Sequence, residues 1–591
     1  MRYENNIRFA GLLLILFLAS GAGLHATDVL ERSITVRFNQ TPLKEALATI
    51  AKEGGFEWSY NANILDGNRR VTLAAEGWSV RETLLFVLGD DYTFKESGEY
   101  LILKRQKKNQ QKLSGYISDQ KTGERMANVT VYDRKTLRST TTNRHGYYEL
   151  PVGDHSEIVV SKLAYRDTIL QVTSQTPRLV KLDMHIDSLP PPAKPTFEDE
   201  LTKVAVELED FFVRSSQKLA TLNVRDSLHR RAQLSVLPGI GTNHRMSGSV
   251  VNDYSLNVFA GYSRGNRIVE VGGLGNINRE NVSGFQAAGL FNIAGDSLHG
   301  VQAAGLFNNL GNTTRGAQFA GIYNFTGHTL RGAQFGGIGN YAGFTAAGSW
   351  QAAGIMNVAF RGKPGIQMAG IVNHAHQSVF QAAGIANTAD TLQGVQAAGI
   401  FNRAGLARGV QIGLINYARE IRGVQLGLIN LSRQGGYVVL EFSANDVFVT
   451  NAAFKSGVPA LYTILTAGFD PDSPNNNRFW AYGAGLGARA RLARWSGLSF
   501  DLIHRHLNEG DHTNHIQEWD QAALALDLNF GKHFSIAGGP TANLFYADPN
   551  RFGTATLRER VVSNDRLSNS QNADGWLSAW WGWTAAVRIR F

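Results

Sequence analysis

Four histidines near the carboxyl end of the chain form a cluster that could bind a metal ion. His504 and His506 stand two residues apart and share one face of an extended strand, while His512 and His515 follow in the next loop. Imidazole nitrogens are ligands of zinc and copper, so a metal site at the rim of a β-structure is one hypothesis. A polar rim loop is the simpler interpretation, and neither a metal nor a cofactor is predicted beyond these four candidates.

Charged residues on neighbouring strands suggest a second polar site. Asp501 and Asp527 fall on the inward faces of two alternating strands. Arg489, Arg588 and Arg590 do the same on other strands, so the five could form an ion-pair network or simply make an interior polar. A Ser-His-acid triad needs residues that converge in space, and no G-x-S-x-G nucleophile motif occurs. We therefore predict no catalytic residue and no enzyme.

The strands that carry these charges alternate apolar and polar residues with a period of two. Residues 498–502, 521–530 and 581–591 each present one face suited to lipid and one suited to water, the pattern of a transmembrane β-strand. The last of them ends on the aromatic Phe591 and in this resembles bacterial outer-membrane β-barrels, whose assembly signal lies there. A soluble antiparallel sandwich would show the same alternation.

The amino end of the chain has the features of a secretory signal. Arg2 and Arg8 precede the apolar run 12–18, and an A-x-A-like cleavage site follows, so residues 1–26 are predicted to be a signal peptide. The chain contains no cysteine, which excludes disulfides and a lipid-acceptor thiol, and no later apolar run is long enough for a spanning helix. Its net charge of +9 comes from scattered Arg and Lys, so nucleic acid is not a predicted partner.

Residues 27–110 read as strand, helix, strand, strand, helix, strand. Pro42 stands where a first helical position is expected, and Leu43, Ala46, Leu47 and Ile50 make the buried stripe of that helix. The second helix opens with the capping box Ser79–Glu82 and is expected to bury Leu84, Leu85 and Leu88. The whole stretch resembles the STN domain found at the amino ends of secretins and TonB-dependent transducers. The resemblance implies a small periplasmic α/β module that binds protein and catalyses nothing.

Residues 111–186 contain strands and turn signals without a helical period. Thr122-Gly123, residues 127–131 and the run 143–148 (NRHGYY) resemble the carboxypeptidase regulatory-like β-sandwich, with Asn143 where that family usually has Asp. The resemblance implies a non-catalytic module of the kind that often precedes a barrel in outer-membrane proteins.

Residues 187–231 are predicted to be a linker and a helix. Pro190-Pro191-Pro192 is stiff and extended, and Leu201, Val204, Leu208 and Phe211 lie at helical spacing. This helix could pack on a neighbouring module, dock a partner or plug a barrel.

Ten copies of the motif G-x-Q-x-A-G-x-x-N occupy residues 284–430. Side chains within a copy alternate between two faces, so each copy contains a strand and not a helix. In an antiparallel meander each copy would be one membrane-spanning strand, whereas in a parallel β-solenoid each copy would be one coil with Asn and Gln stacked in ladders. The Gln positions are Gln286, Gln302, Gln318, Gln334, Gln351, Gln367, Gln381, Gln396, Gln411 and Gln425.

The meander is the preferred model, because a solenoid would split a barrel whose strands flank the repeats. Residues 254–262 and 267–276 before the repeats, and 437–442 after them, have the alternation of barrel strands. We therefore expect residues 232–591 to form one large antiparallel transmembrane β-barrel of about 20 to 22 strands, with the solenoid as the alternative. In such a barrel, cysteines that replace Asn308 and Asn324 should not crosslink efficiently.

The chain is thus expected to be multidomain and mainly β, with two periplasmic modules before an outer-membrane β-barrel. The barrel region also resembles surface-repeat proteins of Bacteroidetes and spirochaetes, from which no activity follows. The expected role is signal transduction or envelope interaction, in contact with outer-membrane lipid and with a periplasmic or inner-membrane protein, such as the anti-sigma factor that the STN resemblance implies. A pore without a plug domain, since residues 186–232 are too short for one, and a surface adhesin or scaffold are the alternatives.

Overall fold

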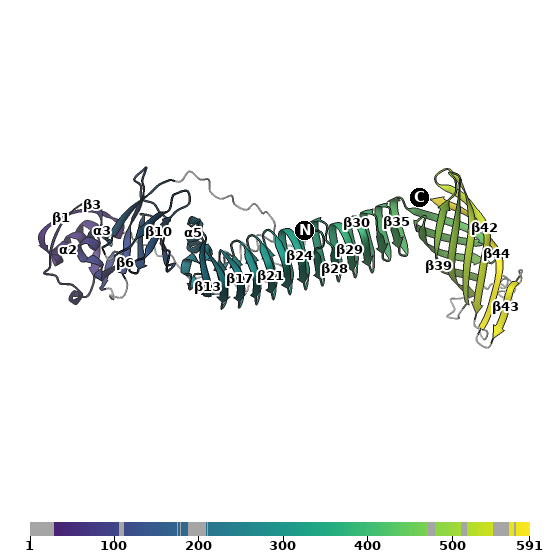
Figure 1. Cartoon of the computed structure of the whole chain (residues 1–591), viewed down its shortest axis with the longest axis horizontal. Coiled ribbons are helices and arrows are strands. Elements are labelled where there is room, and N and C mark those ends of the chain that lie inside the picture. Colours follow the sequence, from purple (N-terminus) through teal and green to yellow (C-terminus); the bar gives the residue numbers. More distant parts are fainter. Residues whose placement is uncertain are drawn as a thin grey trace. The chain divides into compact units, whose positions relative to one another are not determined.

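The computed structural model describes residues 29–105, 111–173, 175–177, 179–186, 209, 211–470, 479–509, 517–547, 566–572 and 575–591. Within these residues the chain is mainly β and divides into two compact units, drawn in sequence colours in Figure 1. The first unit consists of Met1–Pro191 with Leu222–Val224, and the second contains the rest. The predicted signal peptide and residues 201–208 of the predicted helix lie outside the described residues.

The first unit begins with a small α/β module. Strand β1 pairs antiparallel with β3, and β2, β5 and β4 form a second sheet. Helix α2 buries the predicted stripe, but Pro42 precedes its first turn, with ψ at 137°. Helix α3 has the predicted capping box, and Leu85 is only half-buried. The elements are η1 (Val29–Glu31), β1 (Ser33–Pro42), α2 (Leu43–Gly54), β2 (Glu57–Ser59), η2 (Ala62–Ile64), β3 (Arg70–Ser79), α3 (Val80–Leu88), η3 (Gly89–Asp91), β4 (Tyr92–Ser97) and β5 (Tyr100–Arg105).

Two further sheets follow in the same unit and share one apolar core. One has the order β11-β10-β7-β8, and in the other β6 pairs antiparallel with β9 and parallel with β12. The strands are β6 (Gln111–Asp119), β7 (Thr130–Asp133), β8 (Ser139–Thr141), β9 (Tyr147–Val152), β10 (Glu157–Ser161), β11 (Thr168–Gln171) and β12 (Leu179–Met184).

The second unit includes α5 (Ser215–Asn223) as far as Thr221 and continues as a parallel β-solenoid that contains all the repeats. Each coil contributes one strand to each of two parallel sheets, and coil after coil stacks in register (Figure 1). Its elements are β13 (Leu228–Leu237), β14 (Ile240–Gly241), η4 (His244–Ser249), β15 (Val250–Asn257), β16 (Ala260–Ser263), β17 (Gly265–Gly272), β18 (Gly275–Asn278), β19 (Val282–Ala288), β20 (Phe291–Ala294), β21 (Leu298–Ala304), β22 (Phe307–Leu310), β23 (Thr314–Ala320), β24 (Tyr323–Gly336), β25 (Gly339–Thr345), β26 (Trp350–Ala353), β27 (Met356–Gly362), β28 (Ile366–Ala369), β29 (Val372–Ala383), β30 (Ala386–Ala398), β31 (Phe401–Ala407), β32 (Val410–Ile412), β33 (Ile415–Ile421), β34 (Val424–Leu426) and β35 (Ile429–Gln434).

Amides of the repeat motif fill the solenoid core in two ladders. Gln302 Nε2 donates to Gln286 Oε1 at 2.7 Å, and this bond recurs from coil to coil as far as Gln425. Asn308 Nδ2 donates to Asn324 Oδ1 at 2.8 Å and also to a backbone carbonyl of the next coil, and this pattern recurs as well. The Gln ladder therefore donates toward the amino end and the Asn ladder toward the carboxyl end.

The glycine after the motif alanine lets consecutive coils approach closely at one turn. A Cβ on Gly305 would lie 2.1 Å from the carbonyl oxygen of Gly289, and a Cβ on Gly321 would lie 2.1 Å from that of Gly305. Any larger residue would push the coils apart and break the amide ladders, so the motif needs glycine here.

The preferred sequence model of the repeats was therefore wrong and its alternative correct. Asn308 and Asn324 are direct partners on parallel strands, which antiparallel barrel strands could not provide. Residues 254–262 and 267–276 also belong to the solenoid, so no barrel is split by the repeats. Period-two alternation is common to both architectures, and the same running direction of every copy was the discriminating signal.

A closed antiparallel barrel follows the solenoid. Strands β36 to β42 and β44 pair in sequence order, and β44 closes the barrel on β36, so it has eight strands and not 20 to 22. The shorter β43 pairs with residues 575–580 of β44, whereas β36 pairs with residues 584–590. The strands are β36 (Tyr437–Asn445), β37 (Thr450–Val458), β38 (Leu461–Asp470), β39 (Phe479–Arg491), β40 (Ser496–Glu509), β41 (Gln517–Phe530), β42 (Phe534–Ala547), β43 (Arg566–Asn572) and β44 (Gly575–Arg590).

The register of the solenoid predicts a crosslink between exposed residues of adjacent coils. Ile322 N–H donates to the carbonyl of Leu306 at 2.8 Å, so the Cα atoms of the double variant Leu306→Cys/Ile322→Cys lie within disulfide range. We expect efficient disulfide formation under mild oxidation. The mobility on a non-reducing gel of a fragment that contains both cysteines measures it. The pair Leu306→Cys/Ile338→Cys, two coils apart, should stay reduced. Crosslinking of the second pair instead of the first would refute the register.

The buried carboxylate at the amino end of the Gln ladder predicts a pH dependence. Glu270 accepts hydrogen bonds from Asn257, Asn278 and Gln286, and burial raises the pKa of its carboxyl above the usual value of 4.5. The folded state then binds a proton that the unfolded state has lost, so stability falls as pH rises above about 4.5 through the folded pKa. Glu270→Gln should remove this slope in urea midpoints recorded against pH. The variant Glu280→Gln, at a half-buried pair with Arg264, should keep it.

Candidate functional site

The barrel has an apolar exterior. On β41 the outward residues Leu524, Leu526 and Leu528 are exposed, whereas Gln521 and Asp527, which point the other way, are buried inside. Trp495, Phe530 and Phe534 lie where the strands turn at one end of the barrel. An exterior of this kind, with aromatic residues at its border, is what a barrel presents to lipid.

The two ends of the barrel differ in the length of their connections. The connections 459–460, 492–495 and 531–533 are short, and the solenoid enters at this end through β35 and β36. At the other end the strands are joined across 446–449, 471–478, 510–516 and 548–574, of which the last includes β43. The solenoid therefore enters the barrel at the end with the shorter connections.

An ion-pair network fills the barrel interior near the solenoid end. Lys455 is fully buried, and its Nζ lies 2.5 Å from Glu441 Oε2 and 2.7 Å from Asp501 Oδ2. Arg588 bonds Glu441 through Nε at 2.5 Å and also pairs with Asp527. Charges of both signs therefore neutralise one another across five strands, which is what an interior without bulk water requires.

The network includes four of the five residues that the sequence suggested. Arg489 Nε reaches Asp527 Oδ2 at 2.7 Å, whereas Arg590 donates to Ser535 Oγ at 3.0 Å and stays at the edge of the network. Sequence reasoning missed Glu441 and Lys455. Each is a single charge on the inward face of an otherwise uncharged strand, and that inward placement was the available signal.

Aromatic side chains fill the barrel interior toward the end with the longer connections. Phe448, Trp519, Phe545 and Trp580 are buried in one cluster, and the rings of Phe448 and Phe479 stack with centroids 4.7 Å apart. Side chains thus fill the lumen in both halves, as small barrels of eight strands do.

The candidate metal-binding histidines are only partly described. His504 and His506 lie on the outer face of β40 and are bound to carboxylates of β41: His504 Nδ1 lies 2.8 Å from Asp520 Oδ1, and His506 Nδ1 lies 2.9 Å from Glu518 Oε1. His512 and His515 fall outside the described residues. Within the described ranges, no group of three or more His, Asp or Glu side chains could hold a metal ion.

Hydrogen bonds join the α/β module of the first unit to the sandwich that follows it. Ser79 Oγ lies 2.9 Å from Tyr116 Oη, and Glu82 pairs with Lys181 at 3.1 Å. Burial opposes ionisation of Glu82, but bonds from Ser79 and Lys181 together hold the pKa of its carboxyl below the usual value. Burial raises the pKa of Tyr116 to about 12. The capping box of α3 therefore also holds the two modules together.

A hollow of about 250 Å³ lies at this junction, lined by Arg81, Leu85, Tyr92, Thr93, Phe94, Lys112, Ser114, Tyr147 and Glu149. Arg81 pairs with Glu31 at 2.9 Å and covers the Tyr147 ring at 4.2 Å, and Lys112 pairs with Glu149 at 2.5 Å. Its cations are thus neutralised within the unit.

Comparison with known proteins gives no match: no family model, no curated protein and no solved structure is significantly similar to this chain. Among the helices of the described ranges, none combines the length and apolar character needed to cross a membrane.

The buried network predicts a large effect of removing its central cation. Lys455→Met leaves Arg588 as the cation that Glu441 and Asp501 still share, and breaking a buried pair in this way costs about 3–5 kcal/mol. Urea unfolding in detergent, followed by tryptophan fluorescence, should show this loss. Lys532→Met, at an exposed turn, should change the unfolding free energy by less than about 0.5 kcal/mol. Equal effects would mean that the network adds nothing to stability.

Proposed function

We propose that this chain is an outer-membrane β-barrel protein whose barrel anchors a periplasmic solenoid and two amino-terminal protein-interaction modules. The observation that carries the proposal is the closed barrel with an apolar exterior and an interior filled by ion pairs and aromatic side chains. Closure of β36 on β44 gives each of the eight barrel strands a neighbour on both sides, and a β-structure must be closed in this way to reside in hydrocarbon. The short connections at the solenoid end support a periplasmic location for everything that precedes the barrel.

An anchoring role is favoured over a pore. Lys455 and Arg588 pair with carboxylates across one half of the lumen, and Phe448 and Trp519 are buried in the other half. An ion would have to displace paired charges and packed rings to pass. Planar-bilayer recordings distinguish the two roles: stable unitary conductance from the purified chain would favour the pore.

The amino-terminal modules are proposed to bind a protein partner, as the resemblance of residues 27–110 to STN domains implies. Phe86 on α3 supports this role, since its ring is 59% exposed and packs edge-on against Trp78 with centroids 5.8 Å apart. In transducers that share this module the partner is an anti-sigma factor in the inner membrane. The proposed role is therefore transfer of a signal, or attachment of the envelope layers, and not catalysis.

The anchoring proposal predicts that charge on the barrel exterior is costly only at mid-depth. Leu526 lies midway along the outward apolar run of β41, so Leu526→Arg should lower the unfolding free energy in lipid vesicles by about 2–4 kcal/mol. Leu492→Arg, in the short turn after β39, should cost about 0–1 kcal/mol. Urea titration of the heat-modifiable gel band measures both. If neither substitution changed the unfolding free energy in lipid vesicles, a membrane location of the barrel would be contradicted.

A further inference from the structure

One edge of the solenoid is a continuous row of aliphatic side chains. The residue after the motif glycine is Leu or Ile in all ten repeats, and each of these side chains is 37–47% exposed. Because successive coils are one strand spacing apart, the row runs for roughly 45 Å. Its members are Leu290, Leu306, Ile322, Ile338, Ile355, Ile371, Ile385, Ile400, Leu414 and Leu428. Exposed apolar surface on this scale marks an interaction site.

The backbone of this aliphatic edge is paired although it forms a turn. Leu306 N–H donates to the Leu290 carbonyl at 2.8 Å, and Ile322 N–H donates to that of Leu306 at the same distance. The pattern continues to Ile400, whose N–H reaches the Ile385 carbonyl at 3.2 Å. Unpaired backbone groups are what keeps ordinary turns out of hydrocarbon. The aliphatic edge can therefore contact acyl chains without losing backbone hydrogen bonds.

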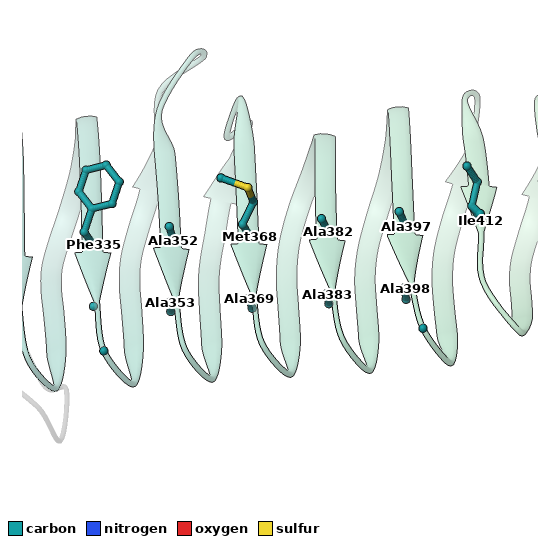
Figure 2. Close-up of a pocket in the computed structure, with 13 residues that line it drawn as sticks. Phe335, Ala352, Ala353, Met368, Ala369, Ala382, Ala383, Ala397, Ala398 and Ile412 are labelled. Carbon is teal, nitrogen blue, oxygen red and sulfur yellow. The ribbon is translucent and has the colours of Figure 1, made fainter.

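A groove extends the apolar surface from this edge onto the sheet whose strands carry the Gln ladder. It has a volume of about 830 Å³, and Figure 2 shows two rows of apolar side chains, mostly alanine, along its strands. Ala352, Ala382 and Ala397 lie in the row that also holds Phe335 and Ile412, and the second row lies nearer the turns that carry the aliphatic edge. The groove is lined by Ala, Gly, Phe, Met and Ile, so it offers a ligand no charge.

Charged side chains gather at the opposite edge of the solenoid, where each coil leads into the next. They include Arg279, Glu280, Asp296, Arg361, Lys363, Asp390, Arg408, Glu420, Arg422 and Arg433. The solenoid is therefore amphipathic across its width, which is the property of an element that lies at a lipid–water boundary.

The aliphatic edge continues into the exterior of the barrel. Thr463 Oγ1 on β38 donates to the carbonyl of Leu428, the last residue of the row, at 3.4 Å. Tyr462 and Ile464 are fully buried inside the barrel, so Thr463 stands on its outer face. Asn430 Nδ2 also donates to Thr463 Oγ1, at 3.0 Å, which fixes the last coil at this position.

We propose that the aliphatic edge and the adjoining groove bind the acyl-chain region of the lipid leaflet in which the barrel is anchored. This inference rests on the proposed function, because the lipid that the aliphatic edge contacts belongs to the membrane in which the barrel is proposed to be anchored. Lipid is favoured over a second copy of the chain by the continuity with the barrel exterior and by the backbone pairing that runs from Leu290 to Ile400. The amide ladders hold the row straight, so all coils contact one surface.

Site-specific labelling tests this proposal directly, since the chain has no native cysteine. The full-length variants Leu306→Cys and Ile371→Cys place an environment-sensitive NBD fluorophore on the aliphatic edge. His299→Cys is the matched control, exposed in the same coil as Leu306 and roughly 20 Å away along the strand. Leu526→Cys reports whether the barrel itself is in lipid. Each protein is inserted into phosphatidylethanolamine–phosphatidylglycerol vesicles with and without acyl-chain nitroxide lipid.

We expect the labels at positions 306, 371 and 526 to shift to the blue and to lose most of their emission with nitroxide lipid, and the label at 299 to do neither. Unquenched labels at 306 and 371 beside a quenched label at 526 would overturn the inference and leave the proposed function intact. A blue shift at 306 that lipid does not quench and that dilution removes would identify a second copy and overturn it equally. An unquenched label at 526 would remove the membrane anchor and the inference with it.

Discussion

Every Gln and Asn of the repeat is buried in the solenoid, so each amide needs partners for two N–H groups and one carbonyl oxygen. A copy of the same residue one coil away supplies a donor or acceptor at the right spacing, provided that the strands are parallel and in register. A shift of one residue would turn all the amides outward and the aliphatic residues inward. The register therefore fixes the core, the straight aliphatic edge and the close approach of the glycines at the same time.

The barrel solves a different burial problem with different chemistry. Its interior holds ions instead of amides. Lys455 contacts two carboxylates and Arg588 contacts three, so no single pair could be removed without leaving a charge unmatched. Replacing such groups by well-packed apolar residues is often neutral or stabilising. The presence of the network is therefore weak evidence that these residues were selected for stability. It does fix which strands lie opposite one another, because its members come from β36, β37, β39, β40, β41 and β44.

Sequence reasoning succeeded where the signal was local and failed where it depended on strand direction. The stripe of α2 and the capping box of α3 need only a few consecutive residues, and both were found where predicted. Alternation located the strands of the repeats but could not say whether neighbours run parallel, so the barrel was drawn too large. The ion-pair network was found in part: Asp501, Asp527, Arg489 and Arg588 share the inward phase of their strands. Glu441 pairs with Arg588 across 147 residues, a separation that no local pattern encodes.

The opposed directions of the two amide ladders bear on how many coils such a solenoid can have. An amide stack that donates one way accumulates a dipole along its axis, much as a helix does. Here the Gln stack points toward the amino end and the Asn stack toward the carboxyl end, so their axial dipoles oppose each other in every coil. A coil gained or lost by duplication or deletion adds one link to each stack and leaves the net dipole nearly unchanged. The number of coils, and with it the length of the solenoid, can therefore differ without a change in the net axial dipole.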